Sequence, residues 1–88
     1  MSDIKQRFFQ DDYLEQMPRK EQDRLQVFDV MIQYFKFDRT YTEQEVNKVL
    51  RDVCGDFALM RRYLVTYGYL ARNDNGSAYI RVAEKSDT

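Results

Sequence analysis

Two adjacent residues near the middle of the chain, Gly55 and Asp56, constrain its fold more than any other feature. Glycine readily adopts the left-handed backbone that ends a helix, and aspartate is a preferred cap at the start of the next helix. Apolar residues at helical spacing lie on both sides of this pair. The sequence therefore predicts two helices that are joined by a very tight turn and cross sharply, as in a helix-turn-helix.

The first of these helices has a complete start signal. Thr42 and Glu45 have the S/T-x-x-E spacing of a capping box, in which the hydroxyl and the carboxylate each accept a backbone N–H. The second helix, residues 56–67, is predicted to stop at Gly68. Its side chains divide into a core side, with Phe57, Leu59, Met60, Tyr63, Leu64 and Tyr67, and an opposite side, with Ala58, Arg61, Arg62, Val65 and Thr66.

A β-hairpin is predicted after the second helix, because two segments rich in strand formers flank Asn75-Gly76. A two-residue loop at Asn75-Gly76, which we favour, sets Arg72 opposite Tyr79. A three-residue loop with a glycine bulge would instead set Arg72 opposite Ala78.

Ahead of these elements, apolar spacing predicts a long helix over residues 20–35. A short helix over residues 3–9 and a loop over residues 10–18 are predicted before it, and residues 37–41 are predicted to add a brief strand to the edge of the hairpin. In the long helix, the predicted core stripe is Leu25, Phe28, Met31, Ile32 and Phe35, and a second apolar edge is Val27, Val30 and Tyr34.

These elements together predict one domain over residues 1–88 with an α+β fold that is mostly helical. Its core, residues 19–82, is predicted to be a winged helix-turn-helix, with three helices and the C-terminal β-hairpin as the wing. The extra short helix and the loop occupy residues 1–18, and residues 83–88 are predicted to be a disordered tail.

The residue types argue against several chemical functions. The 88 residues include no His and a single Cys, so the usual metal ligands and the usual general base near neutral pH are missing. The sequence also lacks a Gly-rich phosphate loop and a nucleophile motif. We therefore expect no enzymatic activity, no metal and no cofactor, and we expect Cys54 to be a small buried hydrophobe. No signal segment or membrane span is recognised, which predicts a cytoplasmic location.

The charges are distributed unevenly, although the net charge is only -1. Residues 1–38 hold six Lys or Arg against eight Asp or Glu, whereas residues 39–82 hold seven against five. The helix-turn-helix half is therefore mildly basic. Nucleic-acid-binding domains commonly have a pI above about 9. The pI of this chain is about 5.4, so the mildly basic half is only a weak indication of a nucleic-acid partner.

Several short runs with joint spacing resemble an uncharacterised bacterial domain family. They comprise Tyr41-Thr42-Glu43, Glu45-Val46-Asn47, Asp56, Arg61-Arg62, Leu64-Val65, Gly68, Arg72, Gly76 and Tyr79. The resemblance covers about Pro18 to Arg81, and the family occurs alone or as the C-terminal part of winged-helix transcription regulators. It implies a winged-helix-like domain with a regulatory association, and it does not establish a molecular function.

Double-stranded DNA is the partner that this arrangement favours, with the chain acting as a small transcription regulator. Residues 56–67 would be the recognition helix that enters the major groove, where Arg61 and Arg62 can read guanine. A structural role for Arg61, paired with Asp56 or Glu45, stays open. The remaining candidate contacts to nucleic acid are Thr66, Lys48, Arg51, Arg72 and Arg81.

A second hypothesis is a non-catalytic module that keeps the winged-helix shape and binds a protein partner or a second copy of itself. The second apolar edge of the long helix and the N-terminal segment would then form the contact surface. The candidate residues for this surface are Val30, Tyr34, Ile4 and Phe8.

Overall fold

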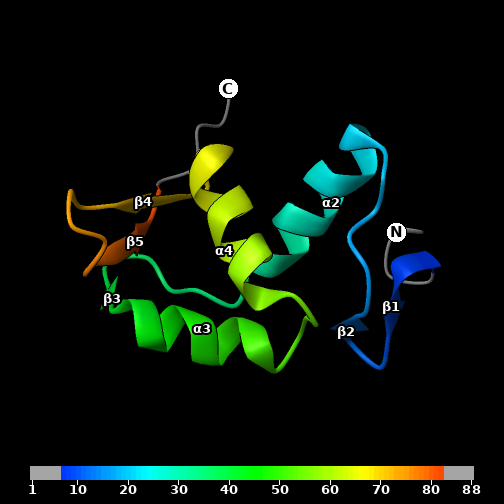
Figure 1. Cartoon of the computed structure of the whole chain (residues 1–88), viewed down its shortest axis with the longest axis horizontal. Coiled ribbons are helices and arrows are strands. Elements are labelled where there is room, and N and C mark those ends of the chain that lie inside the picture. The colour runs from blue at the N-terminus through cyan, green and yellow to red at the C-terminus, as the bar shows by residue number, and fades with distance from the viewer. Residues whose placement is uncertain (1–6, 83–88) are drawn as a thin grey trace.

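The computed structural model describes residues 7–82 and contains the two helices predicted on either side of the tight turn (Figure 1). Helix α3 (Glu43–Arg51) begins with the predicted capping box: the Glu45 N–H donates to the Thr42 hydroxyl at 3.1 Å, and the Thr42 N–H donates to the Glu45 carboxylate at 2.9 Å. Helix α4 (Phe57–Thr66) begins at Asp56, whose carboxylate accepts a first-turn N–H at 3.2 Å. Both predicted helix starts are confirmed.

The prediction of a left-handed backbone at Gly55 is wrong. Among the described residues, the glycines with positive φ are Gly68, at 85°, and Gly76, at 73°. A Cβ at Gly55 would lie 3.4 Å from the Glu15 carbonyl oxygen and 3.5 Å from the Tyr13 hydroxyl, which are ordinary van der Waals distances, so the available space does not require glycine here either. Gly68 follows α4 directly after its C-cap, as predicted.

Residues 10–18 are not simply the loop that was predicted, because they contribute to a small antiparallel sheet. Strands β1 (Phe9–Gln10) and β2 (Tyr13–Leu14) pair in it, and the turn between them is Asp11-Asp12, with φ values of 54° and 66°. Aspartate is one of the few non-glycine residues that tolerate this left-handed region, which two-residue hairpin turns require. Of the predicted helix over residues 3–9, Arg7 and Phe8 are helical, Phe9 belongs to strand β1 instead, and residues 3–6 lie outside the described residues.

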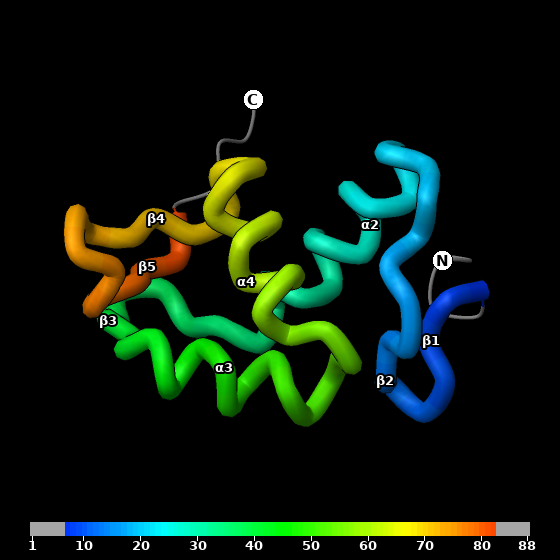
Figure 2. The backbone as a smooth tube through the Cα atoms, viewed as in Figure 1, coloured from blue at the N-terminus to red at the C-terminus, as the bar shows by residue number. Residues whose placement is uncertain are grey.

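The N-terminal sheet is joined to the turn between α3 and α4, as the path of the backbone shows (Figure 2). The Leu14 N–H donates to the Val53 carbonyl at 2.8 Å, and the Gly55 N–H donates to the Leu14 carbonyl at 3.0 Å. These two bonds form a parallel bridge between Leu14 and Cys54. The N-terminal segment is therefore part of the fold, because strand β2 is hydrogen-bonded to the turn between α3 and α4.

Helix α2 (Glu21–Ile32) lies inside the predicted range 20–35, and four of the five predicted core residues, Phe28, Met31, Ile32 and Phe35, are buried. Leu25 is 36% exposed, whereas Val27 is completely buried. Val27, predicted on the second apolar edge, is thus in the core in place of Leu25. The Phe28 ring packs 5.7 Å from the Tyr63 ring of α4. The buried core gathers side chains from all of these elements: Phe9, Leu14, Val27, Phe28, Met31, Ile32, Phe35, Tyr41, Val46, Leu50, Val53, Cys54, Met60, Leu64, Leu70 and Tyr79.

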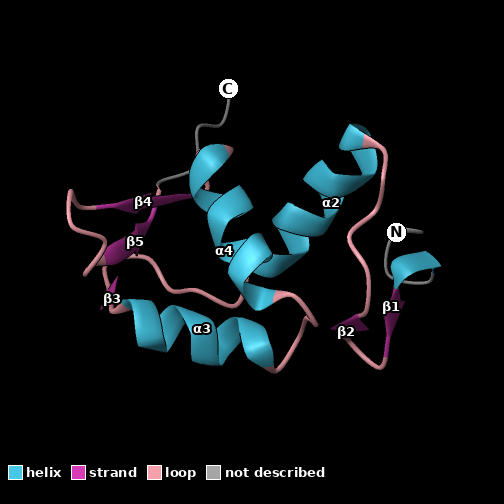
Figure 3. Ribbon diagram, viewed as in Figure 1, coloured by secondary structure: helices cyan, strands magenta, loops and turns pink. Residues whose placement is uncertain are grey.

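A second antiparallel sheet, with three strands, combines the C-terminal hairpin with a strand that precedes α3 (Figure 3). Its strands, in the order β3-β5-β4, are β3 (Thr40–Tyr41), β5 (Tyr79–Arg81) and β4 (Leu70–Arg72). The prediction that residues 37–41 add a brief strand beside the hairpin is confirmed.

The hairpin register is the one that we favoured, with Arg72 opposite Tyr79. Its loop is longer than the predicted two residues, because the Gly76 N–H donates to the Asn73 carbonyl at 3.1 Å and the turn is therefore centred on Asp74-Asn75. The Asn73 side-chain oxygen also accepts the Ser77 N–H at 2.9 Å. This side-chain bond stabilises the longer loop without changing the register.

Candidate nucleic-acid interface

A hollow of about 330 Å³ lies where the start of α3, the outer side of α4 and the hairpin meet. Three of its side chains are arginines and one is a glutamate, so positive charge is in excess. Four of the predicted nucleic-acid contacts, Arg61, Arg62, Thr66 and Arg72, are brought together here. The complete lining is Glu43, Arg61, Arg62, Val65, Thr66, Arg72 and Tyr79.

Arg61 is the fixed member of this group. Its guanidinium donates a hydrogen bond to the Asn47 side-chain oxygen, and it lies 3.8 Å from the Glu43 carboxylate. Only 21% of the Arg61 side chain is exposed. The predicted partners were different ones: Asp56 caps α4, and Glu45 completes the capping box and pairs with Arg39 at 3.3 Å. Arg61 therefore connects α4 to α3 while it contributes charge to the wall of the hollow.

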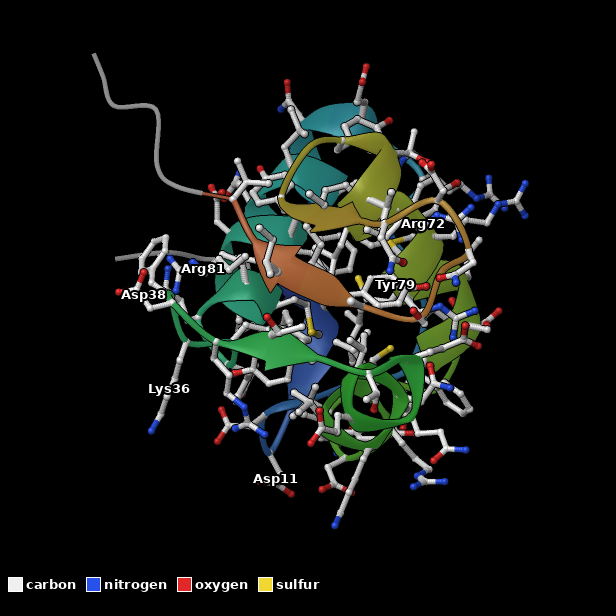
Figure 4. All side chains as sticks on the ribbon, turned by 90° about the vertical axis from the view of Figure 1, so that its left-hand side faces the viewer. Asp11, Lys36, Asp38, Arg72, Tyr79 and Arg81 are labelled. Carbon is white, nitrogen blue, oxygen red and sulfur yellow. The ribbon has the colours of Figure 1, made fainter. Side chains whose placement is uncertain are left out.

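Arg62 and Arg72 line the hollow from different elements, α4 and β4, and are both exposed. Within residues 7–82, neither has a carboxylate at ion-pair distance. A Cβ at Gly76 would lie 3.1 Å from Arg72 Nη1, so the guanidinium folds over the hairpin turn. Figure 4 shows Arg72 beside Tyr79, its cross-strand partner, which is only 2% exposed.

Arg81 lies away from the hollow, on the side of the sheet where Figure 4 labels Asp38. Its guanidinium donates to the Phe35 carbonyl at 2.9 Å and stacks at 3.9 Å from the centroid of the Phe37 ring. The last turn after α2 is thereby held against β5. The Arg81 guanidinium thus makes a hydrogen bond and a ring contact within the fold.

Lys48 and Arg51 are exposed on α3 and do not line the hollow. The Arg51 guanidinium lies 6.0 Å from the centroid of the Phe57 ring. The structure therefore divides the predicted contacts into four that converge and three, Lys48, Arg51 and Arg81, that lie elsewhere.

Three residues that line the hollow were not among the predicted site residues: Glu43, Val65 and Tyr79. Glu43 follows the capping residue Thr42, and its carboxylate faces Arg61 from the neighbouring helix. Tyr79 could have been found from the favoured register, because directly opposed residues in a hairpin share one face of the sheet.

The residues of the alternative partner surface are only partly exposed. Tyr34 is 39% exposed, whereas Val30 and Phe8 are half-buried and pack against the core. Ile4 lies outside the described residues. Other large apolar side chains that are at least as exposed as Tyr34 are Phe37 and Ile80.

A second hollow of about 290 Å³ lies between the N-terminal segment and α4 and includes Met17, Leu59 and Cys54. The Cys54 side chain is buried, as predicted, and only 3% of the residue is exposed. Burial raises the pKa of the Cys54 thiol to about 11, and the nearby Asp56 charge acts in the same direction. The thiol is therefore protonated at neutral pH and has little nucleophilic character.

Residues 7–82 contain no group of three or more His, Cys, Asp or Glu that could hold a metal ion. No helix in this range is long and apolar enough to cross a membrane.

The fold and the hollow define a small α+β domain with a basic surface where two helices and a hairpin meet. The family model described as "Uncharacterized protein conserved in bacteria (DUF2087)" matches residues 13–81, and the chain belongs to this family. The predicted membership of an uncharacterised bacterial family is thus confirmed, and the match starts at Tyr13, so that it includes β2. No curated protein matches the chain, and no solved structure does either.

Proposed function

We propose that this chain is a small DNA-binding regulator that has a winged-helix arrangement and uses α4 as its recognition helix. The observation that carries the proposal is the convergence of Arg62 and Thr66 from α4 with Arg72 from β4 around one hollow. A helix and a hairpin that present cations to a common surface can contact a groove and the adjacent backbone of one duplex.

The order of the elements supports the winged-helix arrangement. Helix α2, strand β3, helices α3 and α4 and the β4-β5 hairpin follow one another, and β3 pairs with β5. In this arrangement α3 and α4 are the helix-turn-helix pair, and the hairpin is the wing. The sequence resemblance to a domain of winged-helix transcription regulators also supports a regulatory role.

Within α4, the exposed side chains suit contact with base edges. Arg62 is exposed and can donate two parallel hydrogen bonds to guanine, and Ala58 is exposed and offers a methyl group to thymine. Arg61 is held by Asn47 and Glu43, so we assign it to positioning α4 and not to reading bases.

The expected binding is weak for one copy of the chain, because the convergent surface offers only a few cations. Each phosphate contact contributes about 0.9 to the slope of log affinity against log salt. A monomer should therefore lose DNA rapidly as salt rises.

The test is fluorescence anisotropy with a mixed-sequence duplex from low to physiological salt. Arg62→Ala should weaken binding, and Arg19→Ala, which removes the same charge from an exposed residue before α2, should not. Absence of binding to the parent protein even at low salt would refute the proposal. Equal binding by the parent and Arg62→Ala would refute the assignment of α4 as the recognition helix.

A protein-interaction or dimerisation module is the second candidate function. Tyr34 and Ile80 favour it, since these large apolar side chains are 39% and 46% exposed. Sedimentation velocity separates the cases: a concentration-dependent dimer that Tyr34→Ser dissociates supports this function, and a strict monomer argues against self-association.

A further inference from the structure

The arginine hollow differs from an ordinary solvated surface in the way its charges are arranged. The lining contains three guanidinium groups, those of Arg61, Arg62 and Arg72, and only one carboxylate, that of Glu43. Arg61 already uses this carboxylate, at 3.8 Å. The positive charge of Arg62 and Arg72 is therefore left without a partner among the described residues.

The shape of the hollow also matters. It has a volume of about 330 Å³ and is formed by elements far apart in the sequence, from Glu43 to Tyr79. Pockets that bind small ligands begin at about 300 Å³, so the space is sufficient for a phosphate group and part of what it is attached to. Val65 and Tyr79 provide the apolar part of the wall.

The three arginines differ in how far neighbouring side chains restrain them, and one restrained guanidinium group with two that have no ion-pair partner within residues 7–82 suits the binding of an anion. Arg61 is fixed by Asn47 and Glu43, so it contributes a stationary charge. Arg62 lies one turn of α4 from Thr66, and these two residues can place a guanidinium and a hydroxyl on the same oxygen atoms. Arg72 contributes a third guanidinium group to the lining from strand β4 of the hairpin.

We infer that the hollow is a phosphate-binding site in which Arg62 and Arg72 hold one phosphate group from two sides. Planar guanidinium groups match the geometry of phosphate oxygens and bind them with charge-assisted hydrogen bonds. The phosphate can belong to the backbone of DNA or to a free phosphate monoester. The first source rests on the proposed function, whereas the second does not.

The decisive variant is Arg72→Gln, because Arg72 is exposed, contributes to no described ion pair and was not used in the test of the recognition helix. Its matched control is Arg19→Gln, which removes the same charge elsewhere on the surface. Urea unfolding of both variants checks that the fold is retained.

Two titrations followed by NMR and anisotropy distinguish the two sources. In the first, inorganic phosphate and then a nucleoside monophosphate are added to the labelled protein, and signals of residues 61–66 and of Arg72 are followed. In the second, the duplex is titrated at several salt concentrations. We expect Arg72→Gln to weaken binding of the true phosphate source about tenfold, as for the loss of one charge-assisted hydrogen bond, and Arg19→Gln to change nothing.

The outcomes separate the inference from the proposed function. Arg72-dependent binding of free phosphate supports the site even if DNA does not bind. If Arg72→Gln lowers the affinity for DNA and also reduces the slope of log affinity against log salt concentration by about 1, the site is supported with DNA as the phosphate source. DNA binding that depends on Arg62 but not on Arg72, with no response to free phosphate, overturns the inference and leaves the proposed function standing. No response to either titrant overturns both.

Discussion

The Arg61 guanidinium on α4 donates a hydrogen bond to the side-chain oxygen of Asn47 on α3, and so links the two helices near the middle of each. The Arg61 side chain is 21% exposed, and the next residue, Arg62, is fully on the surface. Adjacent arginines of the same helix therefore have different tasks, one in holding α4 and one in facing solvent.

We expect Arg61→Ala to lower the free energy of unfolding by about 1–2 kcal/mol, because Asn47 loses a charge-assisted partner. Arg62→Ala should change it by no more than about 0.5 kcal/mol, as for a surface substitution. Urea denaturation followed by circular dichroism measures both values. If the two variants lose the same stability, the hydrogen bond to Asn47 does not contribute as described.

Substitution of Gly68 by alanine should lower the free energy of unfolding more than substitution of Gly55, although the sequence predicted a left-handed backbone at Gly55. Gly68 has a φ of 85°, and alanine there should cost about 1–2 kcal/mol because its Cβ crowds the backbone in this region. Gly55 has no positive φ, and a Cβ would have contacts no shorter than 3.4 Å, so Gly55→Ala should stay within about 0.5 kcal/mol of the parent. Thermal unfolding of the two variants side by side checks the order, and a larger loss in Gly55→Ala would contradict it.

These glycines illustrate which parts of the fold the sequence could predict. The capping box at Thr42, the cap at Asp56 and the end of α4 at Gly68 depend on neighbours within a few residues, and all three were predicted correctly. The surroundings of Gly55 are formed by Tyr13 and Glu15 from the N-terminal hairpin, and no local pattern reveals that these residues lie there.

The same distinction applies to the β-hairpins and to the candidate site. The Asn75-Gly76 signal favoured the observed register but left the alternative with a glycine bulge open, whereas Asp11-Asp12 has no glycine and was included in the loop predicted over residues 10–18. Arg61, Arg62, Thr66 and Arg72 were predicted as candidate contacts, but which candidates line one hollow depends on how α4 packs against the hairpin and was not predicted. The contact between Arg81 and the Phe35 carbonyl joins residues 46 positions apart, so it depends on how α2 packs against the sheet and could not be predicted.

The capping box should make stability depend on acid pH. The hydrogen bond from the Thr42 backbone N–H, supported by the Arg39 charge, holds the pKa of Glu45 below its ordinary value of 4.5. A folded-state pKa that is lowered gives stability that is present above the ordinary pKa and is lost as the pH falls through the folded value. We expect the parent to be more stable than Glu45→Gln near neutral pH, and the difference to shrink as the pH is lowered to about 3. Urea midpoints of both proteins over this range test it, and a difference that stays constant would exclude the charge of Glu45 as its cause.

The buried thiol should produce the opposite dependence at alkaline pH. Burial raises the pKa of Cys54 from 9.0 to about 11, so between these values the folded protein retains a proton that the unfolded chain has released. Stability from this residue is then fully present below about pH 9 and decreases as the pH rises toward 11. Because tyrosines also ionise in this range, the informative quantity is the difference in unfolding free energy between the parent and Cys54→Ala. We expect this difference to move in favour of Cys54→Ala as the pH increases, and a pH-independent difference would show that the thiol ionises equally in both states.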